Sequence, residues 1–190
     1  MSALDGLRFR LGTLLRPGQF ARDLDEELRF HVALEAMQKE CAARGELSPE
    51  DARFAALRRF GARRIAVASR WSEQLNQALI AYLEHAEIEV LSITSVGQWA
   101  QQAFSMSIEE GVKLAFQLGR EAMRKAPDAE ALLVAGGAWR SLAAVPILEE
   151  DFGIPVVTNP IAQVWRLIER GVAPPVKGWG MLLAHGTMEG

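Results

Sequence analysis

A double glycine at the end of an apolar run could do chemistry through its backbone. The stretch reads LLVAGGAWRSL, from Leu132 to Leu142, and predicts a buried strand, a turn at Gly136 and Gly137, and then a helix. The two glycines either present backbone N–H groups to an anion or only make a tight turn. Ala135, directly before them, offers no acid, base or nucleophile.

Five other candidate residues stand at or near the ends of predicted strands. Ser69 and Thr158 carry hydroxyls that either bind a carboxylate or cap a following helix. Asn159 precedes a proline, a pattern that also fits a simple turn residue. Arg70 and Arg140 could pair with a carboxylate in bidentate fashion, although arginines are common on any surface. Each of these residues therefore has a binding interpretation and a structural one.

A pocket could also be lined by tryptophans, namely Trp71, Trp99, Trp139 and Trp165. The last of these has helical spacing with Ile161 and Ile168, which favours a place in the core. Asn76 lies inside a predicted helix, where packing is the simpler role.

The composition excludes several classes of protein. Apolar residues make up 49% of the 190 residues and the net charge is −3, which is typical of a globular chain and offers no basic surface for nucleic acid. A single cysteine, Cys41, excludes an internal disulfide framework, and three scattered histidines argue against zinc. The sequence shows neither a signal peptide nor about 18 consecutive apolar residues. We therefore expect a cytoplasmic protein without a metal or a membrane span.

Residues 1–61 predict an αα-hairpin that forms a domain of its own. Apolar residues recur at helical spacing from Phe20 to Gly45, where the glycine supplies a C-cap. A second helix begins after Ser48, an N-cap residue, with Pro49 in its first position. It ends at Gly61.

Residues 62–190 predict an α/β domain in which strands and helices alternate. A helical segment follows each of four strand-like runs: RRIAVAS, IEVLSITSV, ALLVAGG and IPVVTNP. Ser107 and Glu110 form a capping box at the start of a long helix in the segment SIEEGVKLAFQLGREAMRKA. The alternation implies a four-stranded parallel sheet of order 2-1-3-4 with helices on both faces, a flavodoxin-like half-domain. A ligand site is expected at the carboxyl ends of its strands.

The first segment resembles a known family. The words RDLDEELRFHVALEA, ARGELSPEDAR and ALRRFG, within residues 5–61, are similar to the N-terminal prefix domain of bacterial ABC permeases of the macrolide-exporter type. In that family the hairpin precedes transmembrane helices, for which this sequence shows no candidate.

Residues 63–183 resemble the second half of the maleate isomerases and arylmalonate decarboxylases, in the aspartate/glutamate racemase superfamily. The matching words are APDAEALLVAGGAW, LEEDFGIPVVTNPIAQVW and VKGWGMLL, in the same order. The resemblance implies two α/β halves facing each other across a cleft, and no metal or organic cofactor. It also implies a small carboxylic acid as substrate, with backbone N–H groups and hydroxyls that hold its carboxylate. In those enzymes a cysteine acts as acid, base or nucleophile.

The sequence departs from that family at three points. Ala135 stands where the cysteine of the second half is implied, and Trp71 stands where the decarboxylases have a tyrosine. The hairpin of residues 1–61 stands in place of the family's first half. We therefore expect no catalytic residue in this chain.

Two functions from different classes follow from these observations. Either the chain acts on or binds small carboxylic acids, with weak or no isomerase, racemase or decarboxylase activity, or it is a non-catalytic remnant that binds a small ligand or a partner. The residues expected to bind a carboxylate are Ser69, Trp71, Gly136, Gly137, Thr158 and Asn159. A half-domain without its twin should expose apolar surface, which predicts a homo-oligomer or docking of the hairpin on that surface.

Overall fold

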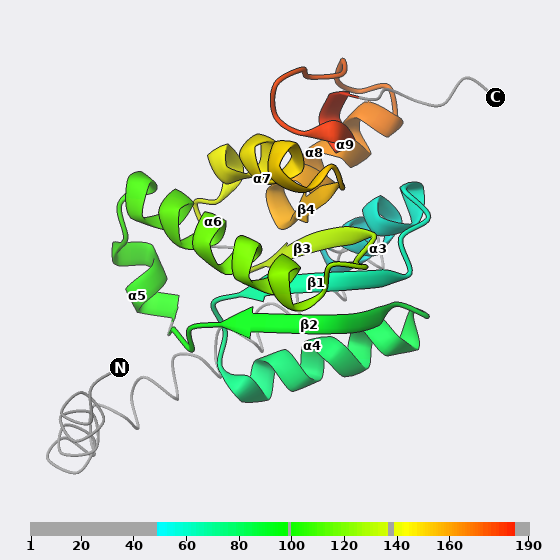
Figure 1. Ribbon diagram of the computed structural model, residues 1–190. Helices are drawn as coiled ribbons and strands as arrows, with labels where there is room; N and C mark the ends of the chain where they lie inside the picture. Colours follow the sequence, from blue (N-terminus) through cyan, green and yellow to red (C-terminus); the bar gives the residue numbers. More distant parts are fainter. Residues whose placement is uncertain (1–48, 99, 137–138, 185–190) are drawn as a thin grey trace, which may run out of the picture. The chain divides into compact units, whose positions relative to one another are not determined.

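The core of the protein is one parallel β-sheet. A computed structural model describes residues 49–98, 100–136 and 139–184, and its elements carry the labels of Figure 1. The strands are β1 (Arg64–Ser69), β2 (Glu89–Ser95), β3 (Ala131–Ala135) and β4 (Val156–Thr158). All three pairings are parallel and the order is β2-β1-β3-β4, which confirms the order predicted from the alternation of strands and helices.

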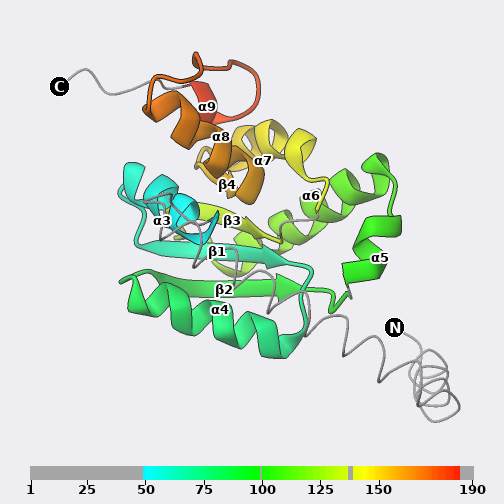
Figure 2. The same cartoon turned by 180° about the vertical axis from the view of Figure 1, so that it is seen from behind.

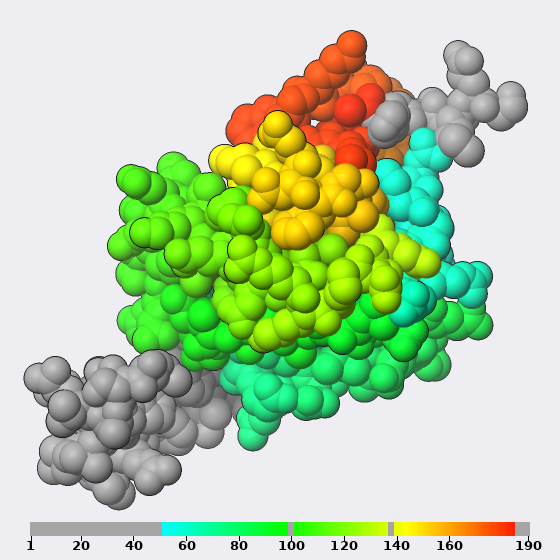
Figure 3. All heavy atoms as spheres, viewed as in Figure 1, coloured from blue at the N-terminus to red at the C-terminus, as the bar shows by residue number. Residues whose placement is uncertain are grey.

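Helices cover both faces of this sheet. They are α3 (Pro49–Arg59), α4 (Glu73–His85), α5 (Ala100–Ser105), α6 (Ile108–Lys125), α7 (Val145–Phe152), α8 (Asn159–Glu169) and α9 (Met181–Ala184), with a 3₁₀ turn over Leu142–Ala144. Helix α6 crosses the near face in Figure 1, and Figure 3 shows α6 and α7 covering the strands from that side. Helix α3 lies on the opposite face, which is turned to the viewer in Figure 2. Helices α5 and α9 were not expected from the sequence.

Helix α6, the longest of the described helices, is fixed at its start by the predicted capping box. The Ser107 hydroxyl accepts a hydrogen bond from the Glu110 N–H at 3.2 Å, and the Glu110 carboxylate accepts one from the Ser107 N–H at 2.8 Å. These hydrogen bonds lower the pKa of the Glu110 carboxyl. Gly119 then brings α6 close to the sheet, because a Cβ there would lie 3.1 Å from a methyl carbon of Leu132. The helix is thereby held tightly over the centre of the sheet.

The central strands are buried along their whole length. Every residue of β3 and β4 is buried, and so is every residue of β1 except the first. A strand covered on both faces gives such a continuous apolar run. The strands therefore form a fixed platform, and chemistry is left to the residues at and just beyond their carboxyl ends.

Helix α3 joins the same core as the sheet. It begins at Pro49, as its N-cap and proline predict, and packs against α8 and β4. Its Phe54 and Leu57 are buried within the one hydrophobic cluster. All the described residues belong to one compact unit. The preceding helix of the predicted hairpin, with Cys41, lies outside the described residues, so a separate 1–61 domain stays a prediction.

Candidate functional site

The carboxyl ends of three strands meet at one edge of the sheet. Ser69 of β1 pairs with Ala135 of β3, and Val134 of β3 pairs with Thr158 of β4. The arrowheads in Figure 1 show this edge, which faces the side where α5 lies. The register therefore brings together the last residues of these strands and the residues that follow them, including five of the six that the sequence nominated for binding.

The segment after β1 is a turn held by two side chains. The Ser69 hydroxyl accepts a hydrogen bond from the Trp71 N–H at 3.0 Å, and the Asn76 amide donates one to the Trp71 carbonyl at 3.2 Å. Ser69 and Asn76 are fully buried, whereas Trp71 is half-buried and packs against the core. The buried Asn76 Oδ1 has no hydrogen-bond partner. Asn76 thus supports the turn, and the Ser69 hydroxyl keeps its own proton to donate.

The segment after β4 starts helix α8. The Thr158 hydroxyl accepts a hydrogen bond from the Ile161 N–H at 3.3 Å and so caps the helix, which is the structural role weighed for it. Asn159 is the first residue of α8 and is also buried, and its Oδ1 has no partner. Asn159 therefore belongs to a helix start and not to a free turn.

The segment after β3 changes direction at Gly136. Its φ of +129° is a conformation that side chains with a Cβ rarely adopt, so the turn favours glycine. Ala135, immediately before it, is completely buried and contributes only a methyl group. Gly137 lies outside the described residues, and its proposed part in binding stays a prediction. A backbone turn is thus present at the end of β3, with no acid–base side chain at Ala135.

A buried arginine lies directly over this turn. A Cβ at Gly136 would be 3.1 Å from Arg70 Nε and 3.5 Å from Arg70 Cγ and Cδ. Arg70 is only 4% exposed, and burial lowers the pKa of its guanidinium group. Its Nε and Nη1 atoms are buried without a hydrogen-bond partner. Arg140, the other arginine singled out in the sequence, is exposed.

The tryptophans do not gather into one pocket. Trp139 is buried and donates a hydrogen bond to the Gly111 carbonyl at 3.1 Å. Trp165 is buried in the core on α8, as its helical spacing predicts. Trp99 lies outside the described residues. Among the described tryptophans, only Trp71 stands at the strand ends.

One buried carboxylate escaped prediction. Glu149 on α7 accepts hydrogen bonds from the Val156 N–H at 3.0 Å and from the Met181 N–H at 2.7 Å. Burial raises the pKa of its carboxyl, although these two hydrogen bonds act in the opposite direction. In the sequence Glu149 is one of three consecutive acidic residues in an amphipathic helix, which is typical of a solvated face. Its role is structural, because it ties α7 to β4 and to α9.

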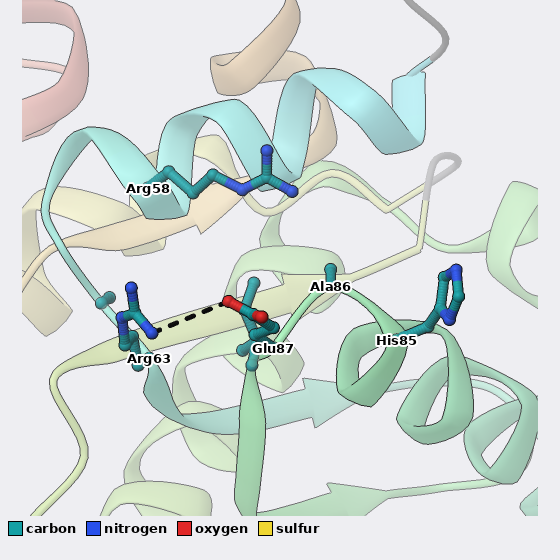
Figure 4. Close-up of a pocket in the computed structure, with 7 residues that line it drawn as sticks. Arg58, Arg63, His85, Ala86 and Glu87 are labelled. Atoms are coloured by element: carbon teal, nitrogen blue, oxygen red, sulfur yellow. Dashed lines mark ion pairs between the residues drawn. The ribbon is translucent and has the colours of Figure 1, made fainter.

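A cavity of about 410 Å³ opens at the opposite edge of the sheet. Figure 4 shows it between the end of α3 and the segments that lead into β1 and β2. Arg63 and Glu87 point toward each other there, 3.8 Å apart, but their side chains are 75% and 82% exposed. An ion pair between solvent-exposed side chains contributes little to stability, because water already solvates both charges. The cavity therefore carries less chemistry than the carboxyl ends of the strands.

The described residues contain neither a group of metal-binding side chains nor a helix suited to a membrane. In residues 49–98, 100–136 and 139–184, no three histidine, cysteine or acidic side chains are grouped so as to hold a metal ion. In the same ranges, no helix combines the length and the apolar character needed to cross a membrane.

Comparison with known proteins agrees with the geometry. A family model described as arylmalonate decarboxylase matches residues 27–183. Arylmalonate decarboxylase from Bordetella bronchiseptica is 26% identical over 155 residues, which cover 80% of this chain and 63% of that protein. The chain thus spans less than two thirds of the length of that relative. The family match begins inside the segment that resembles a permease prefix, and that second resemblance stays a prediction.

Solved structures show the same fold. A glycine-to-cysteine mutant of arylmalonate decarboxylase, in a form associated with a sulfate ion, is 27% identical, with a TM-score of 0.66 over 83% of this chain and 67% of that one. Maleate isomerase Iso from Pseudomonas putida S16 has a TM-score of 0.67 at 20% identity, over 81% and 62% of the two chains. The likeness to the isomerase concerns the fold alone.

Proposed function

Because this chain belongs to the arylmalonate decarboxylase family, we propose that it binds a small carboxylic acid at the carboxyl ends of β1, β3 and β4, with weak or no catalysis of its own. The observation that carries this proposal is the end of β3. Gly136 keeps a turn that only glycine readily adopts, while Ala135 fills the position for which the family resemblance implies a cysteine. The backbone turn that would bind the acid is present, whereas position 135 carries no reactive side chain.

The strand ends carry hydroxyl groups that can donate hydrogen bonds to a bound carboxylate. The hydroxyls of Ser69 and Thr158 accept bonds from backbone N–H groups, so each retains a proton to donate to a carboxylate. Thr158 also marks the start of α8, where a helix favours negative charge. Trp71 and Asn159 complete the proposed wall of the site, together with Gly137. A glycine-to-cysteine mutant of arylmalonate decarboxylase has been solved in a form associated with a sulfate ion, which fits an anion-binding role for this fold.

Alanine at position 135 cannot transfer a proton or act as a nucleophile, which is why we propose weak or no catalysis. Decarboxylation or isomerisation of a small acid develops negative charge, which preorganised donors stabilise. The intermediate must then gain or lose a proton, or be attacked by a nucleophile, and a thiol does this well. A methyl group at position 135 supplies none of these steps. The proposed outcome is binding without efficient turnover, and no cofactor is required for it.

The alternative is a non-catalytic module that binds a protein partner. Exposed apolar side chains favour it: Phe104 on α5 is 62% exposed and Ile108 at the start of α6 is 63% exposed. Such surface is suited to a second copy of the chain or to the predicted hairpin. For either function, we propose that the protein acts in the cytoplasm.

A paired binding and turnover measurement tests the main proposal. Phenylmalonate is titrated into the protein by calorimetry, and the same mixture is then followed by proton NMR for phenylacetate. We expect saturable binding of phenylmalonate with no phenylacetate above the uncatalysed background, and no binding of the neutral diamide of phenylmalonic acid. Efficient release of phenylacetate would contradict the loss of catalysis. Equal binding of the diamide, or binding of neither compound, would contradict carboxylate recognition.

A further inference from the structure

The feature that the proposed function leaves unexplained is the buried guanidinium of Arg70. The residue is 4% exposed, and its Nε and Nη1 atoms have no hydrogen-bond partner. No carboxylate of the described residues forms an ion pair with it. Buried polar atoms in folded proteins are almost always hydrogen-bonded, and a buried charge is almost always paired. An unpaired guanidinium in this position therefore calls for an anion that the described residues do not supply.

The position of Arg70 places this charge in the strand-end site. Arg70 follows Ser69, and Ser69 pairs with Ala135 across the sheet. The Arg70 side chain passes directly beside Gly136, where any Cβ would meet Nε at 3.1 Å. Its backbone carbonyl accepts a hydrogen bond from the Gln98 N–H at 2.6 Å, which fixes the segment from the β2 side. The guanidinium is thus held at the end of β3 by the sheet register and by the absence of a side chain at Gly136.

We propose that Arg70 is the anion-binding residue of the strand-end site, where the N–H groups of its guanidinium hold one carboxylate of a small organic acid. This inference rests on the proposed function for the identity of the anion, but the buried positive charge stands without it. A planar guanidinium matches the two oxygens of a carboxylate, and such charge-assisted pairs are stronger than neutral hydrogen bonds. Ser69 and Thr158 then orient the acid, while Arg70 supplies the charge that selects it.

The test compares two substitutions of Arg70 with a matched control. Arg70→Met keeps the length of the side chain and removes the charge, and Arg70→Lys keeps the charge and removes the planar fork. Arg140→Met removes an exposed arginine near the same edge. Phenylmalonate binding and the melting temperature are measured for each protein, at constant ionic strength, with sodium sulfate as a second anion.

We expect Arg70→Met to weaken phenylmalonate binding on the order of 10- to 100-fold, the range for a lost charge-assisted contact. Arg70→Lys should lose part of the affinity, and Arg140→Met should bind as the unmodified protein does. Without added anion, Arg70→Met should melt at a higher temperature than the unmodified protein, because a buried unpaired charge is gone. A merely structural arginine would lower the melting temperature when replaced.

The outcomes separate this inference from the proposed function. If phenylmalonate binds the unmodified protein and Arg70→Met equally well, the function stands and the role of Arg70 is overturned. If phenylmalonate binds neither, but sulfate stabilises the unmodified protein and not Arg70→Met, the anion site stands and the carboxylate function fails. A lower melting temperature for Arg70→Met in the absence of anion overturns the inference in either case.

Discussion

Ala135→Cys is expected to give the protein a thiol with a pKa below its ordinary value of about 8.5, and with it turnover of phenylmalonate. The new sulfur would stand at the end of β3, one residue before the Gly136 turn, beside which the buried Arg70 guanidinium lies. A neighbouring positive charge favours the thiolate. Because a positioned acid–base group contributes about 100- to 10,000-fold, we expect a gain on the order of 100-fold over the unmodified protein.

Two measurements follow this substitution. The rate of alkylation by iodoacetamide is recorded against pH in a Cys41→Ser background, so that only the new thiol reacts, and phenylacetate formation is followed by NMR. Ala135→Ser is the matched control, since a hydroxyl of similar size has no useful pKa. A thiol at position 135 that resists alkylation, or one that reacts but yields no more phenylacetate than the serine control, would contradict a site that lacks only its reactive group.

Glu149→Ala is expected to destabilise the fold by about 2–4 kcal/mol. The substitution leaves the Val156 and Met181 N–H groups without their acceptor, and each unpaired buried donor costs about 1–3 kcal/mol. The effect should reach β4 and α9 together, because Glu149 joins them to α7. Chemical denaturation measures it. Glu150→Ala removes the exposed neighbouring carboxylate and should leave the midpoint unchanged, so an equal loss in both variants would contradict the account.

The buried carboxyl of Glu149 should also make the free energy of unfolding depend on pH, and the direction of its pKa shift sets the sign. Burial raises the pKa of Glu149 in the folded protein above its unfolded value, so the folded state binds the proton more tightly. Its contribution to stability is therefore complete below the unfolded pKa, and is lost as the pH rises through the folded pKa. The free energy of unfolding of the unmodified protein, relative to Glu149→Gln, should fall as the pH rises above the ordinary glutamate pKa of about 4.3. A difference that grows as the pH rises would contradict the buried environment of Glu149.

Much of the fold is predictable because its signals are local. The capping residues Ser107 and Thr158 each sit at a helix start that the structure confirms. The continuous apolar run of β3 predicts a strand covered on both faces, and the alternation of strands with helices predicts the sheet order. These signals require only neighbours within a few residues, so the sequence alone displays them.

The parts that could not be predicted depend on distant contacts. Glu149 looks like a surface residue until Met181, 32 positions later, brings its N–H group to the carboxylate. Arg70 looks like an ordinary arginine until the register of β1 against β3 sets its side chain beside Gly136. Short helices such as α9 form on a surface supplied by the rest of the chain and carry little signal of their own. Burial of a charge is decided by the assembled fold.

Chemical-shift mapping tests the central claim most directly. The backbone amides of the ¹⁵N-labelled protein are followed while phenylmalonate is added, and the neutral diamide serves as the control. Carboxylate binding at the strand ends predicts saturable shifts at Arg70, Gly136 and Asn159, with phenylmalonate unchanged in the spectrum. Shifts confined to the opposite edge, around Arg63 and Glu87, would contradict it, as would the absence of saturable shifts.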